Sequence, residues 1–369
     1  MTTDCVGGVW TYAMTLCRGL VERGVEVTLA ASGGPLDEDK RRDFPAGVTL
    51  HHRPLKCEWM QPPLANLAKA GQWLDELVAE VRPDVIHLND YAHGGRDFGG
   101  RSRVVVAHSD VYSWHAAVLR RAPDASWRGY RDVVEAGLAG ADAVVAPTRA
   151  VLDGMRAWIG DRSAAGAAAS GRVIANAVDG IGEPAGKREP FVLSAGRVWD
   201  EAKNVKLLAE AAGGLSMRVK IAGDARHPDG GEASFDGVEL LGPLPHAELL
   251  ALMRRASIYA LPAKYEPFGL SAVEAALSGC ALVLGDIPSL REVWGDVATF
   301  VSPNDADQLR LTLRRLVDDE AALRRLATLA RDRAKTFTVE RQASAYAGLY
   351  RELVGVKRKD AKRQSQSKE

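Results

Sequence analysis

Two glutamates, Glu266 and Glu274, are the side chains of this 369-residue sequence whose type and spacing most clearly suggest chemistry. Glu274 lies in a predicted helix that begins near Gly269, and most of its neighbours there are apolar. Burying a charge without partners is very costly, so Glu274 needs hydrogen-bond donors, and ribose hydroxyls are suitable ones. Glu266 lies just before the helix, where a loop carboxylate could meet sugar hydroxyls. The alternative is that Glu266 is a solvated loop residue and Glu274 pairs with a core arginine.

The start of the same helix is a candidate phosphate site. The first N–H groups of a helix lack partners within it and carry a partial positive charge, so they can bind a pyrophosphate. Gly269 has no side chain that would keep a phosphate away from the backbone.

Arg197 and Lys203 form a second candidate group. They follow the predicted strand Phe191–Ala195, and open α/β sheets bind ligands at the carboxyl ends of their strands. Two cations at such a place can neutralise a diphosphate as its bond to a sugar breaks. The alternative is that both are surface charges beside Asp200 and Glu201.

The first half of the chain contains weaker signals of the same kind. Gly7 and Gly8 precede a predicted helix, which is typical of a loop that a ligand approaches, and also of a tight turn with a helix cap. His108 follows a predicted strand, at the end where a ligand crevice forms, although most isolated histidines are structural or exposed. His87 and His93 flank another strand end, and one of them could line an acceptor pocket.

The elements that must position these residues follow one pattern along the chain, in which short apolar runs alternate with longer amphipathic stretches. In the first half, strands are predicted at Val25–Ala31, Val48–His51, Asp84–Leu88, Arg103–Ala107, Ala143–Ala146 and Arg172–Ala175. In the second half, they are predicted at Phe191–Ala195, Met217–Ala222, Val238–Leu241, Ile258–Leu261, Ala281–Leu284 and Thr299–Val301. Nearly continuous apolar strands between helices predict parallel sheets covered on both faces. The Gly- and Pro-rich segment Gly180–Pro190 breaks the pattern and is predicted to link two α/β domains.

Two of these motifs resemble a known family. The chain reads E-P-F-G-L-x-x-x-E from Glu266 to Glu274 and G-R-x5-K from Gly196 to Lys203. Both are similar to signatures of glycosyltransferase family 4, retaining enzymes of the glycosyl transferases group 1 type. The resemblance implies the GT-B fold, an α/β architecture of two Rossmann-like domains that face each other across a cleft.

The resemblance also implies roles for particular residues. In the family, the second glutamate holds the donor ribose, the first contacts the transferred sugar, and the helix start between them holds the diphosphate. Catalytic roles are implied for Glu266, His108, Arg197 and Lys203. Nucleotide-sugar binding is implied for Gly7, Gly8, Arg197, Lys203, Glu266, Phe268, Gly269, Leu270 and Glu274.

The implied activity is the transfer of a sugar from a UDP- or GDP-sugar to a glycan, lipid-linked or small-molecule acceptor, with retention and without a cofactor or metal. Two D-x-D pairs are interpreted as structural: Asp305 with Asp307 at a helix start, and Asp37 with Asp39 in a polar loop. A non-catalytic nucleotide-sugar-binding protein and a GT-B nucleotide-sugar epimerase, which needs no acceptor, are the alternatives.

The resemblance divides the chain into four parts. An acceptor-side domain is expected at 1–180, a nucleotide-sugar-binding domain at 187–336, a helix that returns to the first domain at 337–354, and a disordered polar tail at 355–369. Family members open with a buried apolar strand, whereas only a short polar stretch precedes Gly7. The first strand is therefore expected to be truncated and the true start to lie upstream of Met1. An intact mass of the native protein that matches the sequence from Met1 would contradict this.

Composition narrows the class of partner. Lys and Arg together number 48, as do Asp and Glu, so the formal net charge is zero and nucleic acid is not an expected partner. The four cysteines match no zinc-site spacing. No apolar run reaches the roughly 18 residues that cross a bilayer, and no signal-peptide pattern opens the chain, so a cytoplasmic location is expected. The aromatic and arginine-rich segment Trp114–Arg131 could contact the inner face of a membrane, or simply border the acceptor cleft.

Overall fold

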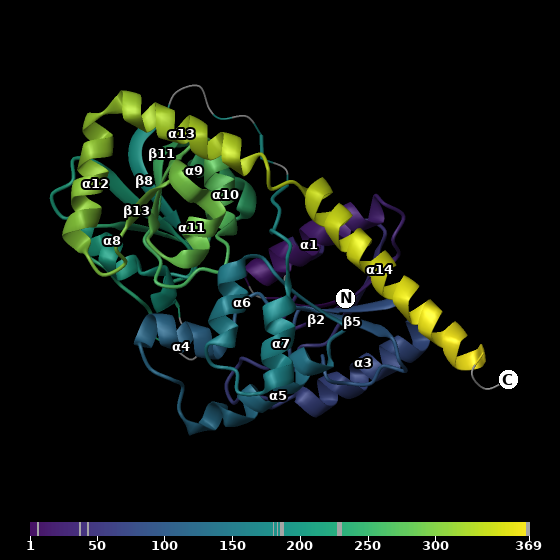
Figure 1. Cartoon of the computed structure of the whole chain (residues 1–369). Helices are drawn as coiled ribbons and strands as arrows, with labels where there is room; N and C mark the ends of the chain where they lie inside the picture. Colours follow the sequence, from purple (N-terminus) through teal and green to yellow (C-terminus); the bar gives the residue numbers. More distant parts are fainter. Residues whose placement is uncertain are drawn as a thin grey trace. The chain divides into compact units, whose positions relative to one another are not determined.

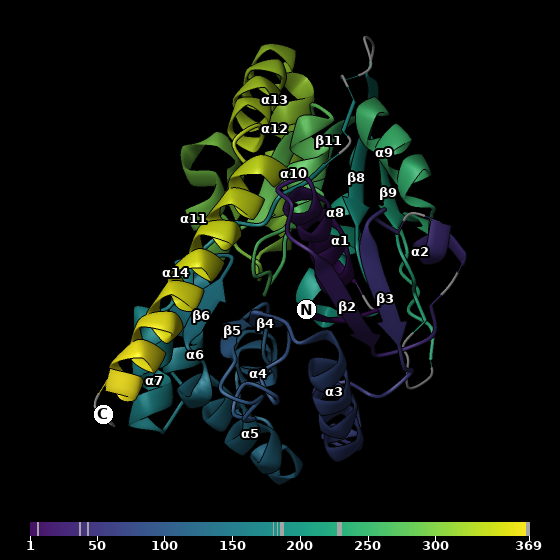
Figure 2. The ribbon, with the colours of Figure 1, turned by 90° about the vertical axis from the view of Figure 1, so that its right-hand side faces the viewer.

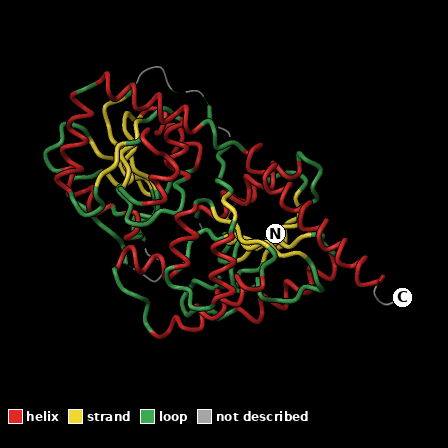
Figure 3. Tube along the Cα trace, viewed as in Figure 1, coloured by secondary structure: helices red, strands yellow, loops and turns green. Residues whose placement is uncertain are grey.

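The computed structural model describes residues 1–5, 7–36, 38–42, 44–179, 181–182, 184, 188–226 and 231–366. The chain divides into two compact units. Unit 1 consists of Met1–His115, Arg121–Ala177 and the chain from Val339 onward, and unit 2 consists of Ala116–Arg120 and Val178–Thr338. In each unit, helices surround parallel strands (Figures 1 and 3). Of the predicted linker 180–190, residues 180, 183 and 185–187 lie outside the described part of the chain.

Unit 1 contains two parallel sheets. The first has the order β1-β2-β3, with β1 at Thr2–Asp4, β2 at Val27–Ser32 and β3 at Val48–His52. The second has the order β4-β5-β6-β7, at Val85–Leu88, Ser102–Val106, Ala143–Ala146 and Arg172–Val173. The helices are α1 (Gly8–Val21), α2 (Glu38–Arg42), α3 (Leu67–Val81), α4 (Val111–Leu119), α5 (Arg128–Gly140), α6 (Arg149–Arg156), α7 (Arg162–Ser170) and α14 (Val339–Gln366), with a 3-10 turn, η1, at Ala125–Trp127.

Strand β5 of the second sheet ends in three successive valines, because both of its faces are covered. In β5, Val105 packs into one core with α3 and α5, and Val104 and Val106 pack into the opposite core with α1 and α14. All three side chains are almost completely buried. Alternate residues of a strand point to opposite faces, so a β-branched residue at every position fits a doubly covered sheet.

The first described strand of unit 1 is short: Thr2–Asp4 forms a parallel ladder with Ala30–Ser32. One prediction for unit 1 needs correction. The tail from residue 355 was expected to be disordered, yet α14 continues to Gln366. The tail is rich in Lys, Arg and Gln, which are good helix formers, so a helix that is already started extends into it at little cost.

Unit 2 is built on one six-stranded parallel sheet with the order β10-β9-β8-β11-β12-β13. The strands are β8 (Glu189–Ala195), β9 (Arg218–Ala222), β10 (Glu239–Gly242), β11 (Ala256–Leu261), β12 (Ala281–Gly285) and β13 (Thr299–Val301). The helical segments are η2 (Glu201–Lys203), α8 (Val205–Ala212), α9 (His246–Arg255), α10 (Leu270–Leu277), α11 (Pro288–Trp294), η3 (Gly295–Val297), α12 (Ala306–Asp318) and α13 (Glu320–Ala334).

The order of the strands reverses between β8 and β11. From β8 the chain builds outward to β9 and β10, then returns to place β11 on the other side of β8. In open α/β sheets, ligands bind outside the carboxyl ends of the strands at such a reversal. The loops that follow β8 and β11 therefore border the expected ligand site of unit 2.

Candidate active site

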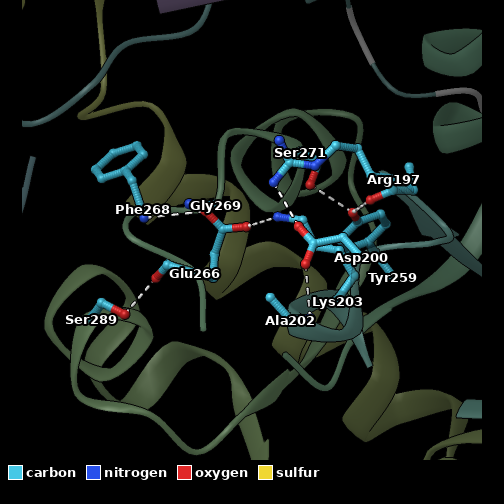
Figure 4. A network of polar contacts seen from close by, with 11 residues as sticks. Arg197, Asp200, Ala202, Lys203, Tyr259, Glu266, Phe268, Gly269, Ser271 and Ser289 are labelled. Atoms are coloured by element: carbon cyan, nitrogen blue, oxygen red, sulfur yellow. Dashed lines mark hydrogen bonds and ion pairs between the residues drawn. The ribbon is translucent and has the colours of Figure 1, made fainter. Parts of the chain in front are cut away.

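The loops after β8 and β11 are joined by an ion pair between Lys203 and Glu266 (Figure 4). Lys203 Nζ donates to Glu266 Oε2 at 2.5 Å, and only 19% and 11% of the two side chains is exposed. Lys203 closes the 3-10 turn η2 after β8, and Glu266 lies in the loop between β11 and α10. The structure thus brings together two residues that the sequence assigned to separate motifs.

Glu266 also caps the start of α10. Its Oε1 accepts the backbone N–H groups of Gly269 at 2.9 Å and of Phe268 at 3.3 Å (Figure 4). Gly269 has a φ of 87°, a left-handed conformation that glycine adopts without strain, and Leu270 opens the helix. The interpretation of Glu266 as a solvated loop residue is therefore wrong. Two of the three amides assigned to a diphosphate are already occupied by Glu266.

Opposing effects set the charge of Glu266. Burial raises the pKa of the carboxyl group, but the Lys203 ammonium and the amides of Phe268 and Gly269 outweigh burial. The pKa of Glu266 consequently lies below its ordinary value of 4.5. At neutral pH the residue is an ionised carboxylate whose oxygens are held by a cation and two N–H dipoles.

Arg197 lies at the turn that follows β8 and Gly196. Its Nη2 donates to Asp200 Oδ2 at 2.6 Å, and 40% of the Arg197 side chain is exposed, compared with 4% of Asp200 (Figure 4). Burial raises the pKa of Asp200, but Arg197 and Lys203 hold it below its ordinary value. Asp200 is therefore a buried anion that orients the Arg197 guanidinium and leaves it accessible to a ligand.

Glu274 lies one turn inside α10 and is buried, with 8% of its side chain exposed. Its Oε1 is 2.9 Å from Nε2 of His246, the first residue of α9. The partner is a histidine rather than the core arginine of the structural alternative. His246 is 54% exposed, so the pair lies at the edge of the core.

Side-chain hydroxyls fix the two loops. The Tyr259 hydroxyl of β11 donates to Ala195 O at 3.1 Å and can accept from the Ser271 hydroxyl, whose Oγ lies 2.7 Å away, so it links the end of β8 to α10 (Figure 4). Ser289 of α11 donates to Glu266 O at 2.5 Å. The sequence analysis did not single out His246, Tyr259 or Ser289, because each acts through a contact far along the chain that has no local pattern.

The remaining predicted residues belong to unit 1. Gly7 is the N-cap of α1 with a φ of 65° and a ψ of −144°, Gly8 opens the helix, and both are exposed. His108 follows β5, and its Nε2 lies 2.9 Å from Asn89 Oδ1. Because Asn89 Nδ2 donates to Thr2 O, Oδ1 is the acceptor, so His108 carries its proton on Nε2 and presents Nδ1 as an acceptor. Burial lowers the pKa of His108 to about 3, so the ring is neutral at neutral pH.

His87 and His93, the two histidines that flank a predicted strand end, have different partners. His87 is buried, its Nδ1 lies 2.6 Å from the Tyr350 hydroxyl of α14, and its role is structural. His93 pairs with Asp90 at 2.7 Å and lines a small pocket of about 60 Å³ together with Glu58. Burial raises the pKa of Glu58 to about 7, despite hydrogen bonds from the Tyr91 and Ala92 amides.

The D-x-D pairs were interpreted as structural. Asp305 caps α12, where its side chain accepts the N–H of Gln308 at 2.8 Å, as expected. Asp37 of the other pair lies outside the described residues. Within the described part of the chain, no group of three His, Cys, Asp or Glu side chains is arranged to hold a metal ion.

Two family models match successive parts of the chain. Residues 6–179 match the family model described as Glycosyltransferase Family 4, and residues 182–333 match the model described as Glycosyl transferases group 1. The chain belongs to the glycosyltransferases in which these two domains follow one another, and its fold is the GT-B type with two Rossmann-like domains.

Curated relatives match over part of their length. A segment of 113 residues, 30% of this chain, is 42% identical to 27% of the glycogen synthase of Mycobacterium tuberculosis. A segment of 123 residues, 32% of this chain, is 36% identical to 30% of the MMP alpha-(1->4)-mannosyltransferase of Mycolicibacterium hassiacum. The chain thus spans less than a third of these relatives' length in each match.

Solved structures match over nearly the whole chain. Sucrose-phosphate synthase from Thermosynechococcus elongatus superposes with a TM-score of 0.76 at 21% identity, covering 96% of this chain and 95% of that one. HepE of Anabaena, in complex with UDP-glucose, superposes with a TM-score of 0.69 at 16% identity, covering 95% of this chain and all of that one. At these identities the likeness shows the fold. Among the described helices, none is long and apolar enough to span a membrane.

Proposed function

We propose that the protein is a retaining glycosyltransferase that moves a sugar from a nucleotide-diphosphate sugar to a hydroxyl of an acceptor. The observation that carries the proposal is the Lys203–Glu266 pair at the strand reversal of unit 2, joined to the start of α10. Membership in the two glycosyltransferase families supports the reaction class. HepE complexes with UDP and with UDP-glucose support a UDP-sugar as the first donor to test.

In the proposed reaction, the bond between the anomeric carbon and the diphosphate breaks, a bond to the acceptor oxygen forms, and the hydroxyl proton is released. Arg197 and Lys203 stabilise the charge that grows on the leaving diphosphate, which is often the largest catalytic contribution. Glu266 accepts hydroxyls of the transferred sugar, and Glu274 accepts those of the ribose. His108, being neutral, contributes an acceptor nitrogen rather than a positive charge.

The proposed reaction uses no metal ion, because Arg197 and Lys203 provide cationic charge where the diphosphate is expected. Transfer rates measured with and without EDTA test this part of the proposal. Equal rates support it, and loss of activity that Mg²⁺ or Mn²⁺ restores contradicts it.

A thermal-shift screen against UDP, GDP, ADP, dTDP and their common sugars is the test of the donor site. A ligand that binds only the folded state adds about 2.7 kcal/mol of stability at a hundredfold excess over its Kd. One nucleotide is expected to stabilise the wild type and to stabilise Glu274→Ala clearly less. Glu210→Ala, an exposed glutamate of α8, is the matched control and should respond like the wild type.

Incubation of the stabilising nucleotide sugar with and without acceptors then separates the reaction classes. A glycosylated acceptor with the donor's anomeric configuration supports the proposal. Conversion of the donor sugar without any acceptor identifies an epimerase, and binding without turnover identifies a non-catalytic nucleotide-sugar-binding protein.

A further inference from the structure

A polar network crosses the interior of unit 1 and ends at His108. Strands β4 and β5 lie side by side, and helix α14 packs against them (Figure 2). The Tyr350 hydroxyl of α14 lies 2.6 Å from His87 Nδ1, and His87 Nε2 lies 3.2 Å from Asn89 Oδ1. Asn89 follows β4, and its Oδ1 also lies 2.9 Å from Nε2 of His108. Two imidazole rings therefore share one amide oxygen.

Contacts with β1 fix the orientation of the Asn89 amide. Its Nδ2 donates to Thr2 O at 2.7 Å, and the backbone N–H of Asn89 donates to Thr2 Oγ1 at 2.9 Å. The reversed amide would place Oδ1 against Thr2 O, and two acceptors would then meet with no proton between them. Oδ1 therefore faces the two histidines.

The tautomers of both rings follow from this orientation. An amide oxygen accepts up to two hydrogen bonds and donates none, so His87 and His108 each carry a proton on Nε2 and a lone pair on Nδ1. On His87, the lone pair accepts the Tyr350 hydroxyl. On His108, Nδ1 has no hydrogen-bond partner among the described residues, and the ring is partly exposed. The lone pair of His108 Nδ1 is thus the unused acceptor of the network.

The surroundings of His108 also restrict its ring. Tyr12 of α1 packs edge-on against the imidazole, with ring centroids 4.5 Å apart and an interplanar angle of 70°. Burial lowers the pKa of His87 and of His108 to about 3, so neither ring takes a second proton at neutral pH. A neutral ring with its proton held at Nε2 offers one defined acceptor, whereas a ring that changes tautomer offers an acceptor and a donor in turn.

We propose that Asn89 is a positioning residue: its Oδ1 holds His108 in the Nε2–H tautomer, so that Nδ1 accepts a hydroxyl of the substrate. The step to the substrate rests on the proposed glycosyl transfer, whereas the tautomer of His108 is a property of the free protein. A substrate whose hydroxyl donates to Nδ1 is bound in preference to its deoxy or O-methyl analogue, because the analogue leaves the acceptor unpaired.

Histidine 15N NMR of the free protein tests the tautomer, because nitrogens with and without a proton differ in chemical shift. The His108 signals are identified by their loss in His108→Ala. The wild type is expected to carry the His108 proton on Nε2 alone near neutral pH. Asn89→Leu removes the acceptor oxygen, so both tautomers of His108 should then be populated. A wild-type His108 with its proton on Nδ1, which needs no variant to detect, would overturn the proposal, as would an unchanged single tautomer in Asn89→Leu.

Thr2→Val is the matched control for structural damage near Asn89. It removes the hydroxyl that accepts the Asn89 N–H and donates to Asp90 Oδ2 at 2.8 Å, but it keeps the backbone carbonyl that holds Asn89 Nδ2. Thr2→Val should lower Tm and keep the Nε2–H tautomer of His108. Loss of that tautomer in Thr2→Val would mean that general loosening of this region, rather than the Asn89 oxygen, sets it.

Transfer kinetics then test the link from Asn89 to the reaction. Asn89→Leu should lower kcat/KM about tenfold, the effect of one hydrogen bond, and Thr2→Val should change it by less than about twofold. In the His108→Ala background, Asn89→Leu should change kcat/KM by less than about twofold, because Asn89 acts only through His108. Equal losses in the two backgrounds would overturn the positioning role. Absence of transfer by the wild type would contradict the proposed function, and the NMR result would still decide whether Asn89 sets the tautomer.

Discussion

At the scale of single residues, Glu266 joins two loops of unit 2 because its carboxylate oxygens bind different elements. One oxygen accepts the Lys203 ammonium, and the other accepts two amides at the start of α10. A buried carboxylate that loses its cation keeps only neutral donors, and the remaining charge is costly. The pair therefore contributes to stability as well as to the site.

Lys203→Met is expected to lower the free energy of unfolding by about 3–5 kcal/mol, because it leaves the Glu266 carboxylate buried without its cation. Adding Glu266→Gln should recover part of the loss, giving a coupling energy of about 0.5–3 kcal/mol in a double-mutant cycle. Urea unfolding measures each variant. Lys335→Met is the control, because Lys335 pairs with Asp332 at an exposed site and should cost no more than about 1 kcal/mol. Strictly additive losses would show that the pair is not coupled.

Low pH should also lower the free energy of unfolding, because it protonates the Glu266 carboxylate. Its folded pKa is below the ordinary 4.5, so the stability it contributes is complete above that value and is lost as pH falls through the folded pKa. Denaturant unfolding between about pH 6 and pH 3 should show a shallower decline for Glu266→Gln than for the wild type. Asp200 also has a lowered pKa, so part of the decline should remain. Parallel curves for the two proteins would refute this assignment.

The sequence predicted which residues of unit 2 carry charge at the site, but not how they pair. Lys203 and Glu266 were assigned from motifs that lie on different loops, and only the strand reversal brings them together. His246 meets Glu274 across 28 positions of sequence, and no periodicity signals such a contact. The capping of α10 by Glu266 depends on the path of a loop, which local residue preferences do not define.

At the scale of elements, the loops after β8 and β9 approach so closely that one glycine is required. Gly223 has a φ of 146°, and a Cβ built on it would lie 1.7 Å from Gly196 O. Arg197 directly follows Gly196, so the position of the Arg197 guanidinium depends on the close contact between the backbones of Gly196 and Gly223.

Gly223→Ala is expected to destabilise unit 2 by about 3 kcal/mol or more, because backbone must move to make room for the methyl group. It should also reduce the thermal shift caused by the nucleotide diphosphate. Gly213→Ala is the matched control, because its φ is −55° and the nearest atom to its Cβ is 3.7 Å away. Wild-type stability and binding in Gly223→Ala would mean that the two loops separate readily.

Most strands could be predicted because they are apolar runs between turn signals. Prediction of a strand at Ala281–Leu284, for example, is confirmed by β12 at Ala281–Gly285. Helices such as α7 and α11 are hard to predict from the sequence, because the first is alanine-rich with little amphipathic contrast and the second spans only seven residues. Strand β1 has no signal of its own in the sequence, because Thr2–Asp4 is polar and gains its place from β2 and Asn89 rather than from its own composition.

At the scale of the whole molecule, the two units have separate cores. Leu138 is fully buried in unit 1 with α3, α6 and β6, and Leu208 is fully buried in unit 2 with α12 and β9. A variant in one core should therefore leave the other core's packing unchanged.

Calorimetry should resolve two unfolding transitions. Leu208→Ala and Leu138→Ala should each lower a different transition, with losses of about 2–5 kcal/mol. The nucleotide diphosphate should raise only the transition that Leu208→Ala lowers, since its proposed site lies in unit 2. A single transition that moves equally in both variants would show that the units unfold together.

The membership of α14 in unit 1 has a consequence for synthesis on the ribosome. Every segment of unit 2 precedes Val339, so its sheet can be complete before the last helix leaves the exit tunnel. Unit 1 begins to emerge before unit 2, but the apolar face of α1 is covered by α14, which is made after every segment of unit 2. The domain that starts first therefore finishes last, and during translation its nascent core is the one that needs protection by chaperones.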